Sequence, residues 1–260
     1  MITDYAQAAR EHVAVRIGKH PDEISGLMES DGAIKAEVES IREMLARVHF
    51  QASKGTTGWD DAALVALTRD TSVWTPAGDW YDVRGHLLLL YNCAKWINWP
   101  NPSSPLPSKK TICVEIGVRE GVSSLALLHA MQETGGQLVS VDCDEDGTKA
   151  AIDGIERAGL SKWWDFHCIT SDQFASDVLP GLGKIDMLWI DGCHRIDQVR
   201  KDAENYVPSV RVGGLVFFHD TANADASGPN TVVAELIETG KYYAFTFPWS
   251  CGCSVLEVRG

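Results

Sequence analysis

Four ionisable residues directly follow two apolar segments in the second half of the chain. Asp191 and His194 follow Met-Leu-Trp-Ile, and His219 and Asp220 follow Val-Phe-Phe. If both segments are neighbouring parallel strands, their carboxyl ends lie about 5 Å apart, so these side chains meet at one edge of the sheet. Asp191, His219 and Asp220 could then share one cation, with His194 within reach of a substrate. The structural alternatives are a helix cap for Asp191, a surface position for His194 and a packing role for His219.

A glycine-bearing segment earlier in the chain could bind a cofactor. It reads Glu115-Ile-Gly117-Val-Arg-Glu-Gly121-Val-Ser123, where a predicted strand becomes a predicted helix. Glycines there let a ligand approach the backbone, and the start of a helix offers unsatisfied N–H groups. A plain tight turn is the alternative. The dinucleotide fingerprint G-x-G-x-x-G is absent, because positions 119 and 122 are Arg and Val.

Two further strand ends carry oxygen acceptors. The predicted second strand ends in Asp142, at the position where open α/β sheets bind ribose hydroxyls. The third predicted strand is followed by Thr-Ser171-Asp172, where a carboxylate could accept a hydrogen bond from an adenine amino group. Three such strand ends in succession are much harder to explain as coincidence than one glycine-rich turn.

Alternating strands and helices are predicted to hold these residues. Short runs rich in Val, Ile and Leu, separated by helical stretches, indicate a parallel α/β sheet covered on both faces. The last two strands are close enough for an antiparallel hairpin. The predicted strands are 111–116, 137–142, 165–169, 185–191, 214–219, 242–248 and 254–258, and the predicted helices are near 122–133, 146–158, 195–207 and 229–239.

The first part of the chain has a different pattern. Apolar residues from Ile34 to Val48 recur at helical spacing after Asp31, which can cap a helix. Residues 99–110 contain four Pro and three Ser, so we place a boundary there between a helical cap or substrate domain (1–105) and a cofactor domain (106–260). An aromatic loop with Pro and Gly, Trp74–Tyr81, interrupts the helical pattern and could line an acceptor pocket.

Composition excludes several classes of partner. The chain has 260 residues, is 45% hydrophobic and has a net charge of −13, which disfavours nucleic acid and anionic membrane surfaces. Seven scattered cysteines suit a reducing compartment better than a disulfide framework. The longest apolar stretch, 86–97, is too short to cross a bilayer, and we predict a cytoplasmic protein.

Taken together, the glycine-rich turn, Asp142 and Asp172 resemble the class I S-adenosylmethionine-dependent methyltransferases over about residues 106–260. The resemblance implies a Rossmann-like, seven-stranded, mostly parallel sheet with a C-terminal antiparallel hairpin. It implies that Glu115, Gly117 and Gly121 surround the methionine part of the cofactor, that Asp142 holds the ribose and that Asp172 meets the adenine. Ser123, Ser171 and Asp191 complete the expected set of cofactor-binding residues.

The pattern I-D-G-x-H at 190–194, with V-x-x-G-G-x-V-x-F-x-D at 210–220, resembles the macrocin-type, metal-dependent sugar and natural-product O-methyltransferases. This resemblance implies a divalent metal, magnesium or manganese, on Asp191, His219 and Asp220, with His194 as general base. The chain departs from the family at His219, where an acid is expected. Imidazole favours manganese, iron or zinc over magnesium, or the site binds no metal.

The leading hypothesis is methyl transfer from S-adenosylmethionine to a hydroxyl of a small-molecule acceptor, sugar-bearing or aromatic. The alternatives are a non-catalytic or metal-independent S-adenosylmethionine-binding protein and a nicotinamide-linked oxidoreductase, which the missing third glycine disfavours. The sequence identifies neither the acceptor nor whether the chain forms a homo-oligomer.

Overall fold

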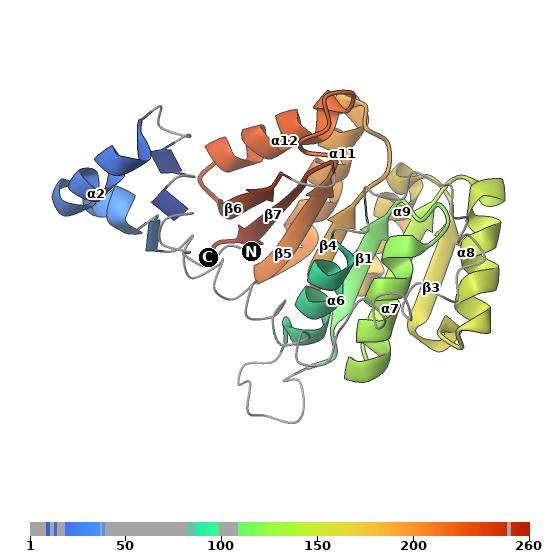
Figure 1. Cartoon of the computed structure of the whole chain (residues 1–260). Helices are drawn as coiled ribbons and strands as arrows, with labels where there is room; N and C mark the ends of the chain where they lie inside the picture. The colour runs from blue at the N-terminus through green and yellow to red at the C-terminus, as the bar shows by residue number, and fades with distance from the viewer. Residues whose placement is uncertain are drawn as a thin grey trace.

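A seven-stranded sheet forms the centre of the computed structural model, which describes residues 9–10, 13–14, 19–36, 38–39, 83, 86–98, 109–248 and 251–260. The strand order is β3-β2-β1-β4-β5-β7-β6 (Figure 1). Strands β1 to β5 pair in parallel, and β7 runs antiparallel to β5 and β6, which confirms the predicted fold class. The strands are β1 (Ile112–Ile116), β2 (Gln137–Asp142), β3 (Trp164–Cys168), β4 (Ile185–Ile190), β5 (Val210–His219), β6 (Tyr242–Phe247) and β7 (Cys253–Val258).

Helices connect the parallel strands and cover both faces of the sheet. The four predicted helices are present, with ends that differ by one or two residues, and two short helices after β3 were not predicted. The helices of this region are α7 (Val122–Thr134), α8 (Glu145–Arg157), α9 (Ser171–Asp177), α10 (Leu179–Leu182), α11 (Ile196–Tyr206) and α12 (Ser227–Glu238). One-turn 3-10 helices, Ser161–Trp163 and Val207–Ser209, precede β3 and β5.

The sheet separates two hydrophobic clusters. One contains side chains of α7 and α8, and the other contains side chains of α9 to α12. Because both faces of the central strands are covered, β4 is buried at every position from Ile185 to Ile190. Continuous burial explains why β4 is apolar along most of its length instead of alternating between apolar and polar residues.

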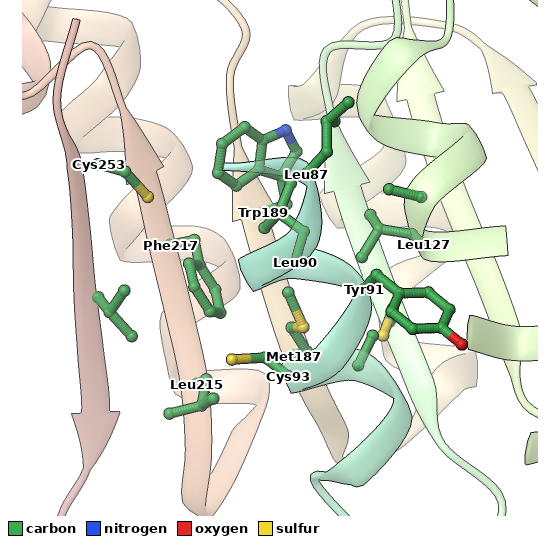
Figure 2. Close-up of a cluster of buried hydrophobic side chains, with 14 of the residues drawn as sticks. Leu87, Leu90, Tyr91, Cys93, Leu127, Met187, Trp189, Leu215, Phe217 and Cys253 are labelled. Atoms are coloured by element: carbon green, nitrogen blue, oxygen red, sulfur yellow. The ribbon is translucent and has the colours of Figure 1, made fainter. Parts of the chain in front are cut away.

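A helix that precedes the predicted domain boundary belongs to the first cluster. This helix, α6 (Leu87–Trp96), packs along α7. Figure 2 shows its side chains Leu87 and Leu90 beside Trp189 of β4. Its C-terminal end is tied to β5, because the Arg211 guanidinium donates a hydrogen bond to the carbonyl oxygen of Ile97. A division at residue 105 therefore separates α6 from the sheet that it covers.

The N-terminal region contains α2 (Pro21–Ser30), whose first turn carries the acidic residues Asp22 and Glu23. The Asp31 carboxylate accepts hydrogen bonds from the backbone N–H groups of Ala33 and Ile34, so it caps the next helical turn. Most of the helix predicted up to Val48, and the aromatic loop 74–81, lie outside the described residues. Within the described ranges, no helix combines the length and apolar character needed to cross a membrane.

Candidate active site

The glycine-rich turn connects β1 to α7 at the carboxyl edge of the sheet. Gly117 and Gly121 have φ values of 93° and 80°, in the left-handed region that favours glycine. A Cβ on Gly117 would lie 2.2 Å from the carbonyl oxygen of Asp191, so any larger residue would push the turn away from β4. The backbone N–H of Asp191 donates to the carbonyl oxygen of Ile116 at 2.9 Å. Gly117 therefore brings the predicted cofactor turn into contact with Asp191.

Glu115 lies beneath this turn and is fully buried. Its carboxylate accepts hydrogen bonds from the hydroxyls of Ser123, Ser124 and Ser140, each at 2.7 Å. Burial raises the pKa of Glu115 to about 7, although the three hydroxyls oppose the shift. Both carboxylate oxygens of Glu115 thus accept hydrogen bonds from serine hydroxyls next to the turn, and a contact of Glu115 with the methionine part stays a prediction.

Asp142 ends β2 and holds the same turn from the other side. Its Oδ2 accepts hydrogen bonds from the backbone N–H groups of Val118 (2.7 Å) and Arg119 (3.0 Å), and its Oδ1 accepts one from Asp144 (2.9 Å). Arg119 has a φ of 44°, which is uncommon for a residue with a side chain. The bonds from Asp142 help to fix this conformation.

The Ser171–Asp172 pair follows β3, next to β2 in the sheet. Both side chains contact α11, which sequence analysis did not anticipate. The Ser171 hydroxyl donates to the buried Asp202 carboxylate at 2.7 Å, and Asp172 accepts from the Lys201 ammonium at 2.5 Å. The sequence signal was a polar residue, Asp202, on the otherwise apolar face of the helix formed by Val199, Ala203 and Tyr206.

The four ionisable residues at the carboxyl ends of β4 and β5 converge, as predicted. Nδ1 of His219 lies 3.2 Å from Oδ1 of Asp191 and 3.0 Å from Oδ2 of Asp220. Nε2 of His194 lies 3.0 Å from Oδ2 of Asp220 and 4.0 Å from Oδ1 of Asp191. His219 is buried, whereas the His194 side chain is 42% exposed. His194 is thus the histidine that a bound molecule can reach.

Charge within this cluster is balanced by its own members. The carboxylates of Asp191 and Asp220 raise the pKa of His194 to about 10. Burial would lower the pKa of His219, but hydrogen bonds to the same two carboxylates outweigh it and raise that pKa to about 11. Burial opposes ionisation of Asp220, yet hydrogen bonds from His194, His219 and Asn223 hold its pKa well below the usual range. Both histidines therefore bind a proton more tightly than a free imidazole does, because two carboxylates face them.

Two residues that sequence analysis missed complete the cluster. Asn223 donates from Nδ2 to Oδ1 of Asp220 at 2.8 Å, which leaves Oδ2 directed at the two histidines. Asp220 has a φ of 58°, so a non-glycine residue is held in the left-handed region. The ring of His86, at the start of α6, packs edge-on against His219 with centroids 5.5 Å apart. No motif marks either residue, because each reaches the cluster only through the folded loop or helix that carries it.

Asp191, His219 and Asp220 have the chemistry and spacing of a cation site. One ligand atom each from Asp191, His219 and Asp220 all lie within 4.8 Å of one another. Two carboxylate oxygens and one imidazole nitrogen are suitable ligands for a borderline divalent ion. The residues present therefore fit a divalent cation.

A cleft of about 210 Å³ joins the glycine-rich turn to this cluster. Of the predicted site residues, the structure brings Gly117, Ser123, Asp191, His194 and Asp220 to its wall. Asp142, Ser171 and Asp172 lie outside its wall, further along the same sheet edge. The cleft is lined by Val83, Gly117, Val118, Arg119, Glu120, Val122, Ser123, Asp191, Gly192, His194, Asp220, Asn223 and Cys251.

Comparisons with known proteins agree with this architecture. Residues 114–221 match a protein family described as a methyltransferase domain. A methyltransferase from Podospora anserina, solved with S-adenosylhomocysteine, has a similar fold with a TM-score of 0.60 at 15% identity, covering 84% of this chain and 96% of its own. No curated protein matches the sequence.

Two O-methyltransferases are also similar in structure. The enzyme from Bacillus cereus, in complex with S-adenosylhomocysteine, has a TM-score of 0.56 at 17% identity, covering 80% of this chain and 96% of its own. TomG from Streptomyces achromogenes, involved in tomaymycin synthesis and solved with S-adenosylmethionine, gives the same TM-score and identity, covering 80% and 94%. Residues 114–221 thus match a methyltransferase-domain family, and the chain shares the fold of these solved methyltransferases.

Proposed function

We propose that the chain transfers a methyl group from S-adenosylmethionine to a hydroxyl of a small-molecule acceptor. The single observation that supports this most strongly is the shared cleft, which both the glycine-rich turn and the cluster of Asp191, His194 and Asp220 line. A methyl donor and an acceptor must meet in line, so a turn suited to the donor has to lie beside a group suited to the acceptor.

The donor is proposed to lie along the carboxyl edge of β1, β2 and β3. Gly117 and Gly121 allow its methionine part to approach the backbone, Asp142 accepts from the ribose hydroxyls, and the Ser171–Asp172 turn meets the adenine. Each carboxylate oxygen has more than one acceptor position, so the bonds that Asp142 and Asp172 already accept do not prevent these contacts.

His194 is proposed as the general base. The sulfonium methyl group is already electrophilic, so the protein must mainly align the acceptor hydroxyl and remove its proton. His194 reaches the cleft, and the contact with Asp220 at 3.0 Å contributes to its pKa of about 10. It can therefore take a proton only once its neutral form is favoured, as a cation beside the two carboxylates would do. Asp191 and His219 hold the Asp220 and His194 side chains in this arrangement.

A divalent cation is proposed on Asp191, His219 and Asp220, with manganese better suited to the imidazole than magnesium. Such a cation would lower the pKa of an acceptor hydroxyl and, by offsetting the two carboxylates, that of His194. One observation favours a metal-independent alternative, since His194 and His219 already balance the negative charge of Asp191 and Asp220.

The acceptor class proposed is a sugar-bearing or aromatic natural product, as in the macrocin-type enzymes. The fold shared with TomG, which acts in tomaymycin synthesis, supports this class. An acid-rich chain with a net charge of −13 is poorly suited to nucleic-acid acceptors.

The experiment is a transfer assay with S-adenosylmethionine and a panel of glycosides and phenols, with matched amines and thiols as controls. Formation of S-adenosylhomocysteine together with a methylated hydroxyl product, identified by mass spectrometry, is the expected result. Transfer only to amines or thiols would contradict the proposed acceptor atom. Donor binding without any transfer would favour the non-catalytic alternative.

A further inference from the structure

A buried carboxylate on α11 lies outside the cleft and takes no part in the proposed chemistry. Asp202 is 1% exposed, and its Oδ1 accepts hydrogen bonds from the Ser171 hydroxyl at 2.7 Å and the Gln198 amide at 3.0 Å. Both donors are neutral. Burial raises the pKa of Asp202, so the fold keeps this side chain inside at a cost in free energy. A buried polar group that is unfavourable for stability can be retained for the arrangement that it imposes.

That arrangement concerns the turn after β3. Four α11 side chains on one helix face contact Ser171 and Asp172, at the spacing i, i+3, i+4 and i+8. Gln198 contacts the Ser171 hydroxyl at 3.2 Å and Asp172 at 3.4 Å. Lys201 donates to Asp172 at 2.5 Å, and the Tyr206 hydroxyl donates to the carbonyl oxygen of Ser171 at 2.6 Å. The turn is therefore held through its backbone and both side chains.

The same turn is fixed at its other end. The Thr170 hydroxyl accepts a hydrogen bond from the backbone N–H of Gln173 and so caps α9. The Phe174 and Tyr206 rings stack with centroids 5.9 Å apart, which joins α9 to α11. The turn lies at the carboxyl end of β3, whose last residue, Cys168, is paired with Asp142 of β2.

We propose that Asp202 is a positioning residue for the adenine end of the methyl donor. This inference rests on the proposed function, because it takes the Ser171–Asp172 turn as the adenine contact. Asp202 acts through Ser171 and Gln198: their bonds to its carboxylate fix the Ser171 hydroxyl and the Gln198 amide, and Gln198 in turn contacts Asp172. Without that carboxylate, both partners can rotate, and Asp172 keeps its bond from Lys201 but loses the second restraint that Gln198 provides.

The test uses calorimetric titration of the full chain with two ligands. S-adenosylhomocysteine contains both ends of the donor, and 5′-methylthioadenosine contains the adenosine end without the amino acid. Asp202→Asn is expected to lower the affinity for both ligands by the same factor, about tenfold, because the charged acceptor that fixes Ser171 and Gln198 is lost. Glu235→Gln is the control, since it breaks the exposed ion pair between Glu235 and Arg200 of α11 without touching the turn. It should change either affinity less than about twofold.

A second variant and the wild type separate the outcomes. Gln198→Ala should weaken both ligands in the same direction as Asp202→Asn, and it gives the same readout if Asp202→Asn fails to fold. Two results would overturn the positioning role and leave the proposed function intact. One is wild-type affinity for both ligands in both variants. The other is a loss of affinity for S-adenosylhomocysteine without a loss of affinity for 5′-methylthioadenosine. A wild type that binds neither ligand would overturn the proposed function as well.

Discussion

His194 and Asp220 form an ion pair at the cleft, with Nε2 of the histidine 3.0 Å from Oδ2 of the aspartate. The aspartate is buried and the histidine is partly exposed. When the His194 imidazole takes a proton from an acceptor, the buried Asp220 carboxylate therefore stabilises the resulting positive charge. This pair accounts for the assignment of the base to His194 instead of the buried His219.

Replacing His194 with Ala should slow methyl transfer without affecting the donor. The expected decrease in kcat is about 10²- to 10⁴-fold, the usual contribution of a general base. The affinity for S-adenosylhomocysteine should stay within about twofold of wild type, because His194 is not among the residues proposed to bind the donor. Steady-state kinetics and calorimetry measure the two quantities. The control is His20→Ala, at the exposed start of α2. Unchanged turnover in His194→Ala would exclude His194 as the base.

Removal of metal should separate catalysis from donor binding. Dialysis against a chelator is expected to abolish turnover but spare S-adenosylhomocysteine binding, and added manganese should restore activity. Asp191→Asn should lower manganese affinity, measured by calorimetry, because one of the three converging ligand atoms loses its charge. Full activity in chelator, with no metal found by elemental analysis, would leave the metal-independent alternative, in which the two histidines supply the positive charge.

Asn223→Ala should disturb Asp220 without removing any charge. The lost hydrogen bond to a carboxylate contributes about 1.5–3 kcal/mol, so a tenfold or larger decrease in kcat is expected. Asp225→Ala is a matched control, because Asn223 accepts a hydrogen bond from the backbone N–H of Asp225 and that bond survives the change. Equal rates for wild type and Asn223→Ala would show that the left-handed conformation of Asp220 is fixed by the backbone alone.

Glu115→Gln should change how stability depends on pH. The folded state raises the pKa of Glu115 from 4.5 to about 7, so the folded protein binds the proton more tightly than the unfolded chain. Stability contributed by wild-type Glu115 is therefore present below pH 4.5 and is lost as the pH rises toward 7. The free energy of unfolding of Glu115→Gln minus that of the wild type should therefore increase across this window by up to about 3 kcal/mol.

Urea unfolding of both proteins at pH 5 and pH 8 measures that difference. The amide keeps an oxygen acceptor for the serine hydroxyls, so the variant should fold at both values. If the difference in free energy of unfolding between the two proteins is the same at pH 5 and pH 8, Glu115 is ionised in the folded state at both pH values.

Much of the fold could be predicted because buried parallel strands leave a clear sequence pattern. β2 begins and ends at the predicted residues, since Leu138, Val139 and Val141 lie between the polar ends Gln137 and Asp142. β5 begins at Val210, four residues before the predicted start at Gly214. The pairing of β4 and β5 shifts register between Ile185 and Met187, and the strand continues past the irregularity.

The candidate site was predictable where it depends on topology. Asp191, His219 and Asp220 follow the ends of adjacent parallel strands, and such ends meet at one edge. The direction of a side chain depends instead on packing across elements. Glu115 faces three hydroxyls from α7 and β2, and Asp202 faces a turn about 30 residues away in sequence, as its contact with Ser171 shows. No local pattern encodes these contacts.

Calorimetric titration tests the assignment of this cleft to a methyl donor. The wild type and Asp142→Ala are titrated with S-adenosylhomocysteine, and the wild type is also titrated with NAD. We expect the wild type to bind S-adenosylhomocysteine without added metal and not to bind NAD. Asp142→Ala should weaken binding by about 1–3 kcal/mol, because it removes a ribose acceptor and the bonds that hold the glycine-rich turn. A wild type that binds NAD but not S-adenosylhomocysteine would contradict the assignment of this cleft to a methyl donor.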